Sequence, residues 1–312
     1  MRRRLRGLLE RPDLAIEHRF RRAPYGGSNQ FLTALRGELR RRGLRVSDGA
    51  FGPRTRACLL HSYLVDVDDL RASIPHGCRV VHRVDGPVEL YRGRDDGADR
   101  QITQINGALA DATVFQSQWS LEAHRELGIE LRDPVVITNA VDPAVFHPPS
   151  ELPEGPRLRV IATSWSDNPR KGAATFAALA GAADASRYEF TFVGRAQGPL
   201  SNIRSLGPLP SAELAAELRA HHLYVAPSLF EPCSNALLEA LACGLPALYR
   251  RSGSHAELVG EGGLGFDGDE DAVAELALLA DELDERRAAI RTPKLADVAD
   301  RYLGVLGIEA PA

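Results

Sequence analysis

Short apolar runs alternate with amphipathic stretches along most of the chain. In the first half, runs bounded by turn residues predict strands at Leu14–Phe20, Leu44–Ser47, Ala57–Tyr63, Arg79–Val84, Ala112–Gln116 and Val135–Thr138. Apolar positions that recur every three or four residues predict helices between them, at Asn29–Arg42, Ala98–Leu109 and Ser117–Leu127. Strands that alternate with helices are typical of a parallel sheet covered by helices.

A second series of the same kind begins after a proline-rich stretch at residues 143–156, which we interpret as a linker. The expected strands are Leu158–Thr163, Tyr188–Val193, Leu223–Ala226 and Pro246–Tyr249, and the expected helices are Ala173–Ala183, Ser211–Ala220 and Asn235–Cys243. The sequence therefore predicts an α/β protein with two doubly wound, Rossmann-like domains, at residues 1–143 and 144–294, that face each other across a cleft. A last helix, Leu295–Leu306, follows Pro293, and we expect residues 295–312 to return to the first domain.

The length of 312 residues agrees with two domains, because single hydrophobic cores rarely grow beyond about 250–300 residues. No run of 18 apolar residues predicts a membrane-spanning helix, and the basic N-terminus lacks the apolar stretch of a signal peptide. The four cysteines have no zinc-ligand spacing, which favours reduced thiols. We expect a cytoplasmic protein without a bound metal.

Positive charge is concentrated at the start of the chain. Residues 1–60 contain 15 arginines and five acidic residues, a balance of +10 in a chain of net charge −4. This excess is consistent either with a solvated arginine-rich surface or with a surface that meets phosphate-bearing acceptors or anionic lipid head groups. The second interpretation predicts peripheral contact with the inner face of a membrane, and neither predicts a nucleic-acid partner.

The segment from Pro227 to Pro246, PSLFEPCSNALLEALACGLP, carries the strongest chemical signal. A strand leads into a loop that contains Glu231, and Ser234 is a favourable N-cap for the helix that follows. The free N–H groups at such a helix start, with Asn235 in the first turn, form a binding site for a diphosphate. Glu239 follows one turn later, where its carboxylate could accept hydrogen bonds from ribose hydroxyls.

This strand, loop and helix resemble the E-x7-E motif of the family 4 retaining glycosyltransferases, which have the GT-B fold. The PS before the loop, the EA after Glu239 and the ACGLP helix end are part of the resemblance. The family also has a basic pair after the first strand of its second domain. In TSWSDNPRKG, Lys171 matches the lysine of that pair, while Ser166 stands where an arginine is expected, so that Arg170 or the Ser166 hydroxyl would serve the phosphates.

The first domain carries weaker matches to the same family. Gly26 and Gly27 lie in a turn before a helix, where relatives have a Gly-Gly loop near the donor phosphate and the acceptor. Asp85 matches a family aspartate on the acceptor side and Arg83 lies beside it, although Val84 replaces a histidine that many relatives carry.

The resemblance implies retaining, metal-independent transfer of a hexose from a nucleotide sugar to a sugar, lipid-linked or small-molecule acceptor, with no other cofactor. Glu231 and Lys171 would be catalytic, and Gly26, Gly27, Ser166, Arg170, Ser234, Asn235 and Glu239 would bind the donor. A non-catalytic GT-B protein that binds a nucleotide sugar or a partner enzyme is the alternative, because the positions of Ser166 and Val84 depart from the family. A metal-dependent GT-A transferase is a second alternative, because Asp66 and Asp68 form a D-x-D after a strand. Short acidic patterns are common in loops, which weakens this alternative.

Overall fold

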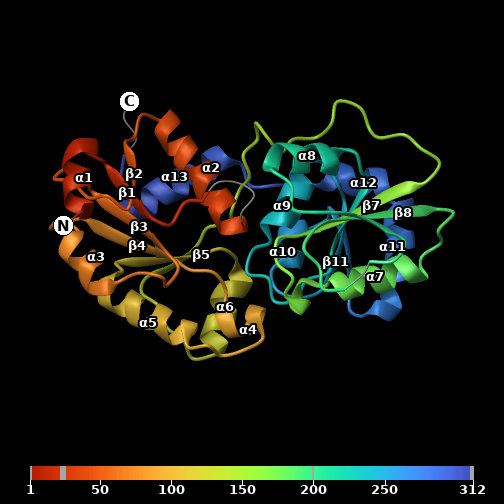
Figure 1. The fold of residues 1–312 in the computed structure, drawn as a ribbon, viewed down its shortest axis with the longest axis horizontal. Coiled ribbons are helices and arrows are strands. Elements are labelled where there is room, and N and C mark those ends of the chain that lie inside the picture. The colour runs from red at the N-terminus through yellow and green to blue at the C-terminus, as the bar shows by residue number, and fades with distance from the viewer. Residues whose placement is uncertain (1, 22–25, 199, 310–312) are drawn as a thin grey trace. The chain divides into compact units, whose positions relative to one another are not determined.

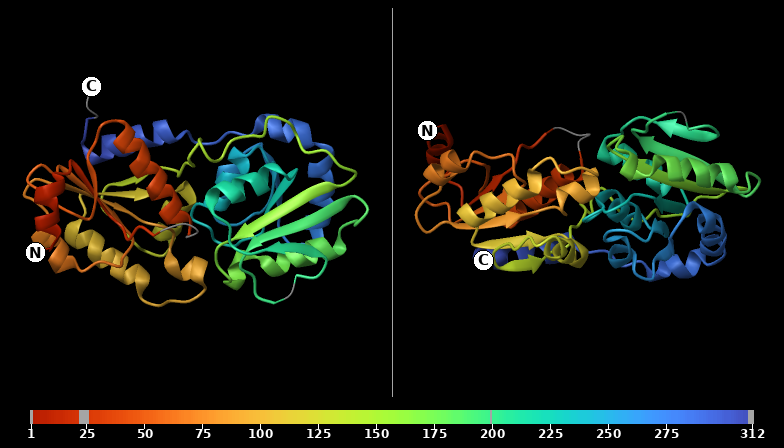
Figure 2. Two further views of the ribbon diagram at one scale, coloured as in Figure 1. Left: turned by 45° about the horizontal axis from the view of Figure 1, so that its top comes forward. Right: turned by 90° about the horizontal axis from the view of Figure 1, so that it is seen from below.

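The computed structural model describes residues 2–21, 26–198 and 200–309, and the chain divides into two compact units. The first unit comprises residues 1–21, 32–139 and 295–312, and the second comprises residues 22–31 and 140–294. Each unit is built on a six-stranded parallel sheet with helices on both faces (Figure 1, Figure 2). The chain is therefore an α/β protein with two doubly wound parts, as the alternating pattern predicts.

The sheet of the first unit has the strand order β2-β1-β3-β4-β5-β6. Its strands are β1 (Leu14–Glu17), β2 (Val46–Asp48), β3 (Ala57–His61), β4 (Arg79–Arg83), β5 (Ala112–Phe115) and β6 (Pro134–Val136). The helices of this part of the chain are α1 (Arg2–Glu10), α2 (Gly27–Arg41), α3 (Val67–Ser73), α4 (Val88–Arg92), α5 (Ala98–Leu109), α6 (Gln118–Glu126) and α13 (Leu295–Leu306). The boundary between the units falls within α2, because the first residues of this helix are grouped with the second unit.

The sheet of the second unit has the order β12-β11-β10-β7-β8-β9. Its strands are β7 (Leu158–Ser164), β8 (Tyr188–Gly194), β9 (Ile203–Leu206), β10 (Leu223–Ala226), β11 (Ala247–Arg250) and β12 (Gly263–Phe266). A 3₁₀ turn, η1 (Pro169–Lys171), precedes α7 (Ala173–Ala182), and the other helices are α8 (Ser211–Arg219), α9 (Asn235–Ala242), α10 (His255–Val259), α11 (Asp269–Asp281) and α12 (Leu283–Ala289). Numbered from β7, this is the dinucleotide-fold order 6-5-4-1-2-3.

Both faces of the second sheet are buried. Along β7, Val160 and Ala162 belong to the apolar cluster that includes Phe176 of α7, whereas Ile161 belongs to the cluster that includes Leu237 of α9. Alternate residues of a strand point to opposite faces, so helices on each side cover a continuous apolar strand. This explains why the strands appear in the sequence as unbroken apolar runs.

The C-terminal helix α13 completes the first unit. Its residues from Leu295 to Leu306 bury one face, and the Arg79 Nε of β4 donates to the Val305 carbonyl at 2.6 Å. Arg42, just after α2, donates to the Ala296 carbonyl at 2.7 Å. The final helix is therefore fixed to both a strand and a helix of the first unit.

The expected element boundaries need correction at several points. β1 ends at Glu17 rather than Phe20, and β6 covers Pro134–Val136 rather than Val135–Thr138. Nine elements that the sequence did not predict are present: α1, α3, α4, η1, β9, α10, β12, α11 and α12. Most of them are short or begin in segments rich in charge or glycine, where periodicity is a weak signal.

Candidate active site

The strand order of the second sheet reverses between β7 and β10, which are hydrogen-bonded neighbours. Ligands of open α/β sheets bind outside the carboxyl ends of the strands at such a reversal. The residues that leave these two strand ends are those from Trp165 onward and from Pro227 onward. The basic segment and the Glu231 loop, both predicted from the sequence, start at these two strand ends. The sheet topology alone does not require both motifs to start at the strand-order reversal.

The loop that carries Glu231 is tied to its neighbours through its backbone. The Leu229 N–H donates to the Arg170 carbonyl at 2.8 Å, and the Phe230 N–H donates to Ser252 Oγ at 2.9 Å. The Ser254 N–H donates to the Glu231 carbonyl at 2.9 Å. These bonds join the loop to the segments after β7 and β11, so the position of Glu231 is set by three stretches of chain.

Two further features show how tightly this loop is held. Phe230 has a φ of 56°, which is uncommon for a residue other than glycine and persists where the surroundings impose it. Gly253 has a φ of 64°, and a Cβ added there would lie 2.5 Å from both the backbone nitrogen and the carbonyl oxygen of Glu231. Gly253 is thus the residue that allows the β11 loop to approach the Glu231 backbone.

Lys171 and Glu231 form an ion pair between Nζ and Oε1. Lys171 ends the turn η1, and Gly172 follows with a φ of 77°, where a Cβ would lie 2.4 Å from the Pro227 carbonyl oxygen. The side chain of Glu231 is 11% exposed and that of Lys171 is 31% exposed. The pair therefore joins one mostly buried carboxylate to an ammonium that still reaches solvent. An ammonium has three donor hydrogens, so Lys171 can hold a second anion while it is bound to Glu231.

Arg170 and Ser166 occupy the same segment with different surroundings. The guanidinium carbon of Arg170 lies 4.9 Å from the centre of the Phe230 ring, a cation–π distance. Ser166 Oγ accepts a hydrogen bond from the Asn168 N–H at 3.2 Å. Arg170 is therefore held beside the residue that precedes Glu231, whereas Ser166 helps to close its own turn.

The start of α9 is capped as the sequence predicts. Ser234 is the N-cap, and its Oγ accepts from the Leu237 N–H at 3.3 Å. Asn235 is the first helical residue, and a Cβ on Gly27 would lie 2.5 Å from its Nδ2. The helix start of α2 therefore lies so close to Asn235 that a side chain at position 27 would require Asn235 to move.

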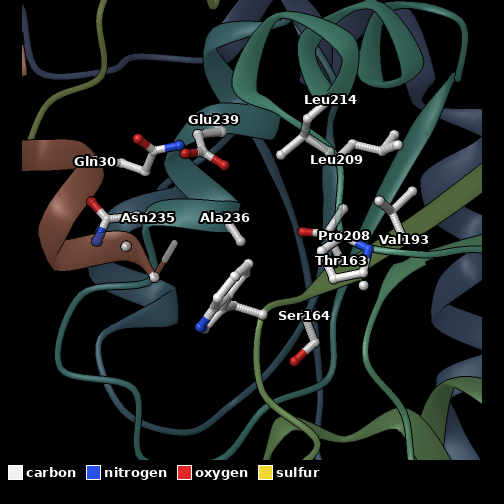
Figure 3. A pocket seen from close by; sticks show the side chains of 14 residues that line it. Gln30, Thr163, Ser164, Val193, Pro208, Leu209, Leu214, Asn235, Ala236 and Glu239 are labelled. Atoms are coloured by element: carbon white, nitrogen blue, oxygen red, sulfur yellow. The ribbon is translucent and has the colours of Figure 1, made fainter. Parts of the chain in front are cut away.

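A pocket with a cavity volume of about 100 Å³ lies beside this helix start (Figure 3). It is lined by Gly26, Gly27, Gln30, Thr163, Ser164, Trp165, Val193, Gly194, Pro208, Leu209, Leu214, Asn235, Ala236 and Glu239. One part of the lining is apolar, with Val193, Leu209 and Leu214, and the rest presents amide, hydroxyl and carboxyl groups. Such a mixture suits a ligand with a flat apolar ring at one end and hydroxyl groups further along.

Two contacts shape the polar side of the pocket. Gln30 Nε2 donates to Ser211 Oγ at the first residue of α8. The guanidinium carbon of Arg195 lies 4.4 Å from the centre of the Trp165 ring, and the backbone N–H of Arg195 donates to the Ser164 carbonyl at 2.9 Å. A cation therefore lies against the indole of Trp165, which lines the pocket.

Glu239 is the carboxylic acid of the pocket, and it is 7% exposed. Burial raises its pKa from the ordinary value of 4.5 to about 8. Its side-chain oxygens accept no hydrogen bond from the residues that the structure describes. A buried carboxyl group that lacks partners and faces a pocket is poised to receive hydroxyl donors from a ligand.

The sequence-predicted catalytic and donor-binding residues thus fall into two neighbouring groups. Gly26, Gly27, Asn235 and Glu239 line the pocket, whereas Ser166, Arg170, Lys171 and Glu231 belong to the loops at the ends of β7 and β10, and Ser234 caps α9. The sequence does not predict five further residues of the pocket, which are Gln30, Trp165, Val193, Leu209 and Leu214. Trp165 was the one detectable signal among them, since it directly follows a strand in a chain with two tryptophans.

Arg83 and Asp85, the expected acceptor-side pair, lie in the first unit at the carboxyl ends of its strands. The guanidinium of Arg83 is completely buried, with NH1 3.5 Å from Asp85 Oδ1 and NH2 donating to Asn139 Oδ1 at 2.8 Å. Gln116 Nε2 also donates to Asp85 Oδ1, and its Oε1 accepts from Asn139 Nδ2 at 2.8 Å. Arg83 therefore supports Asp85 from within the protein, and Asp85, with 26% of its side chain exposed, is the member that solvent reaches.

His61 at the end of β3 is part of the same network. Its Nδ1 lies 3.1 Å from Arg83 NH1, and burial lowers its pKa to about 3. Because arginine is always protonated, the guanidinium is the donor and Nδ1 the acceptor. His61 is therefore a neutral imidazole beside Arg83, at the end of β3, which pairs with β4, the strand that Val84 follows.

The D-x-D at Asp66 and Asp68 has a structural explanation. Asp66 is the N-cap of α3, and its Oδ1 accepts from the Asp69 N–H at 3.0 Å. Among residues 2–21, 26–198 and 200–309, no three histidine, cysteine or acidic side chains gather as they would around a metal ion. The same described residues contain no helix long and apolar enough to span a membrane.

Known proteins share both the sheet topology and part of the sequence. The family model for glycosyl transferases group 1 matches residues 159–281, which include Lys171, Glu231 and Glu239. A comparison with curated proteins gives no match. Sucrose-phosphate synthase from Thermosynechococcus elongatus superposes with a TM-score of 0.71 at 15% identity, over 94% of this chain and 97% of that one.

Two further solved structures are similar over nearly their full length. AviGT4, a glycosyltransferase involved in avilamycin A biosynthesis, has a TM-score of 0.62 at 18% identity and covers 95% of this chain and 97% of its own. HepE of Anabaena in complex with UDP-glucose has a TM-score of 0.65 at 14% identity, with 94% of each chain covered. The fold is GT-B. Within this GT-B chain, the match to group 1 glycosyl transferases falls in the second unit, where the pocket and the Lys171–Glu231 pair lie.

Proposed function

We propose that this protein is a retaining, metal-independent glycosyltransferase that moves a hexose from a nucleoside diphosphate sugar to an acceptor hydroxyl. The observation that carries the proposal is the ion pair of Lys171 and Glu231 at the strand-order reversal, next to the pocket that ends at Glu239. The group 1 match over residues 159–281 supports it, as does the binding of UDP-glucose by the structurally similar HepE.

The pocket suits the nucleoside half of the donor. Val193, Leu209 and Leu214 offer apolar surface to a base, and the carboxyl of Glu239 accepts from ribose hydroxyls. The N-terminus of α9, with Ser234 and Asn235, presents N–H groups to the diphosphate. The close approach of Gly27 to Asn235 keeps the backbone of the α2 start near the same phosphates.

Lys171 acts on the departing phosphate in this proposal. As the bond from the anomeric carbon to the phosphate oxygen breaks, negative charge grows on that oxygen, and a fixed ammonium stabilises it. Arg170 adds charge in place of the arginine that Ser166 replaces, because its guanidinium is held against Phe230 next to the pair. Retention follows if the acceptor hydroxyl enters on the face from which the diphosphate leaves.

Glu231 has two tasks in this arrangement. Its carboxylate orients the Lys171 ammonium, and it faces the sugar, where it holds hydroxyl groups or stabilises the positive charge of the ring. Asp85 is the acceptor-side group, with Arg83 and Gln116 fixing its carboxylate. Sugar, lipid-linked and small-molecule hydroxyls are all acceptors of suitable chemistry.

The test compares donor turnover in matched variants. Lys171→Ala and Glu231→Gln should each lower single-turnover donor cleavage by about 10²-fold or more, if one preorganised electrostatic contact is lost. Lys294→Ala is the control for charge, since Lys294 is the other lysine of the chain and is exposed. Calorimetry with the nucleoside diphosphate should show that Glu231→Gln retains nearly normal affinity.

The anomeric configuration of the product, read by NMR, tests retention separately. An inverted product would contradict the retaining assignment and leave sugar transfer intact. Nucleoside diphosphate binding without any donor turnover, with or without acceptors, would instead favour a non-catalytic GT-B protein that binds a nucleotide sugar or a partner enzyme. Normal turnover in both variants would remove the basis for the proposed site.

A further inference from the structure

Helix α1 is fixed to the first unit along one side only (Figure 1). Arg3 donates to Asp69 Oδ2 at 2.9 Å and to Glu17 Oε1 at 3.0 Å, so one cation joins the helix to β1 and α3. A Cβ on Gly7 would lie 1.9 Å from the Phe51 carbonyl oxygen, which shows that the helix backbone rests directly on that loop. The side that contains Arg3 and Gly7 is therefore occupied.

The other side of α1 presents leucines to solvent. Leu5, Leu8 and Leu9 are 56%, 55% and 87% exposed. Their spacing of three and four residues places them on one face of the helix. Single exposed leucines are ordinary, but three of the seven large exposed apolar residues in the described part of the chain gather in these nine residues. This leucine face is an apolar surface that the folded chain leaves uncovered.

Exposed cations lie on the helix and in the chain around its C-terminal end. Arg6 pairs with Glu10 at 3.1 Å, and Arg11 follows directly after the helix. Arg54 lies in the loop that packs against the helix end, where Thr55 Oγ1 donates to the Pro12 carbonyl at 3.1 Å. Neither Arg11 nor Arg54 forms an ion pair with a residue that the structure describes. The face thus combines apolar side chains with cations available to an outside partner.

We propose that α1 lies in the interface of an anionic lipid bilayer, with the leucine face among the acyl chains and the arginines at the lipid phosphates. A short basic amphipathic helix binds such a surface through the two contributions together. The charge complementarity favours a bilayer over a second copy of this chain, because two α1 helices face to face would bring their arginines together. This proposal does not depend on the proposed transferase activity.

The experiment measures co-sedimentation with vesicles of phosphatidylcholine, with and without phosphatidylglycerol. The wild-type protein should sediment with the anionic vesicles and much less with the neutral ones, and added salt should weaken the binding. Replacing Leu5, Leu8 and Leu9 together by serine should lower the partition coefficient by about tenfold or more. Leu152→Ser with Leu278→Ser is the matched control, because these leucines are 51% and 46% exposed in the second unit.

A charge variant completes the design. Arg6→Gln, Arg11→Gln and Arg54→Gln together should weaken binding to anionic vesicles and flatten its dependence on salt. Circular dichroism should show unchanged folding in every variant, since all the replaced side chains are exposed. Equal partitioning of the wild type onto both kinds of vesicle, or unchanged binding of the triple leucine variant, would overturn the proposal. So would a dimer, detected by light scattering without lipid, that the leucine variant abolishes.

Discussion

Replacing Glu239 by glutamine tests whether the carboxyl of the pocket receives the ribose. Burial holds the pKa of Glu239 at about 8 in the ligand-free protein, so at pH 7 about nine tenths of the molecules carry its proton. If ribose hydroxyls donate to this carboxylate, binding favours the ionised form and lowers the pKa. Each nucleotide bound at pH 7 should then release up to about 0.9 proton from this group.

Calorimetry in buffers of different ionisation enthalpy measures this release. The nucleoside diphosphate has titrating phosphates of its own, so the informative quantity is the difference between the wild type and Glu239→Gln. The wild type should release the additional fraction of a proton, and its affinity should rise with pH until about pH 8, whereas the variant should show neither effect. Identical proton release in both proteins would refute the assignment of Glu239 to the ribose.

The raised pKa of Glu239 also predicts how folding stability depends on pH. Its pKa is higher in the folded protein than the ordinary 4.5 of an unfolded chain, so its stabilising contribution is complete below about pH 4.5. The contribution is lost as the pH rises through about 8. The difference between the pKa values of 4.5 and about 8, at about 1.36 kcal/mol for each pH unit, limits this contribution to the free energy of unfolding to at most about 5 kcal/mol. Urea unfolding should therefore show Glu239→Gln gaining stability over the wild type between about pH 5 and pH 9, and a constant difference would contradict the cause given for the pKa.

Three further substitutions test how the site is held. Gly253→Ala places a Cβ 2.5 Å from the Glu231 backbone at a residue with a positive φ. The variant should lose about tenfold or more in turnover and about 1–3 kcal/mol in the free energy of unfolding. Normal single-turnover rates would show that the close approach is not needed. Gly27→Ala should weaken nucleoside diphosphate binding by about tenfold in calorimetry while the melting temperature hardly changes, because the new methyl group displaces Asn235. Arg83→Met should cost about 3–5 kcal/mol in denaturant unfolding, since it leaves the buried partners of Arg83 without their cation, and a loss below about 1 kcal/mol would indicate that water replaces it.

The sequence predicts the central strands well because a few neighbouring residues are enough to identify each of them. Ala57–His61 and Leu223–Ala226 are short apolar runs between turns, and both form buried strands at or close to the expected residues. β12 was missed because Gly263 and Gly265 give it the composition of a loop; its pairing is supplied by β11, which no local pattern reveals. α1 was missed because its leucines face solvent, so an arginine-rich stretch without a buried face looked like a basic tail.

The residues of the site also divide into those that the sequence predicts and those that it does not. Lys171 and Glu231 are 60 residues apart and each belongs to a recognisable motif, so their pairing follows once both loops are placed at the ends of β7 and β10. The apolar wall of the pocket has no such motif. Leu209 and Leu214 are ordinary apolar residues in the sequence, and only the path of the chain around β9 and α8 places them opposite Ala236.

The ties of the Glu231 loop restrict how the length of the chain can vary. Arg170, Ser252 and Ser254 each fix one backbone point of the segment from Leu229 to Glu231, although they come from two other loops. One residue inserted between β7 and α7, or between β11 and α10, would move a partner by about 3.5 Å and leave its bond unmade. The three loops must therefore keep their lengths together, and a deletion in one of them would disturb the carboxylate as surely as replacing Glu231 itself.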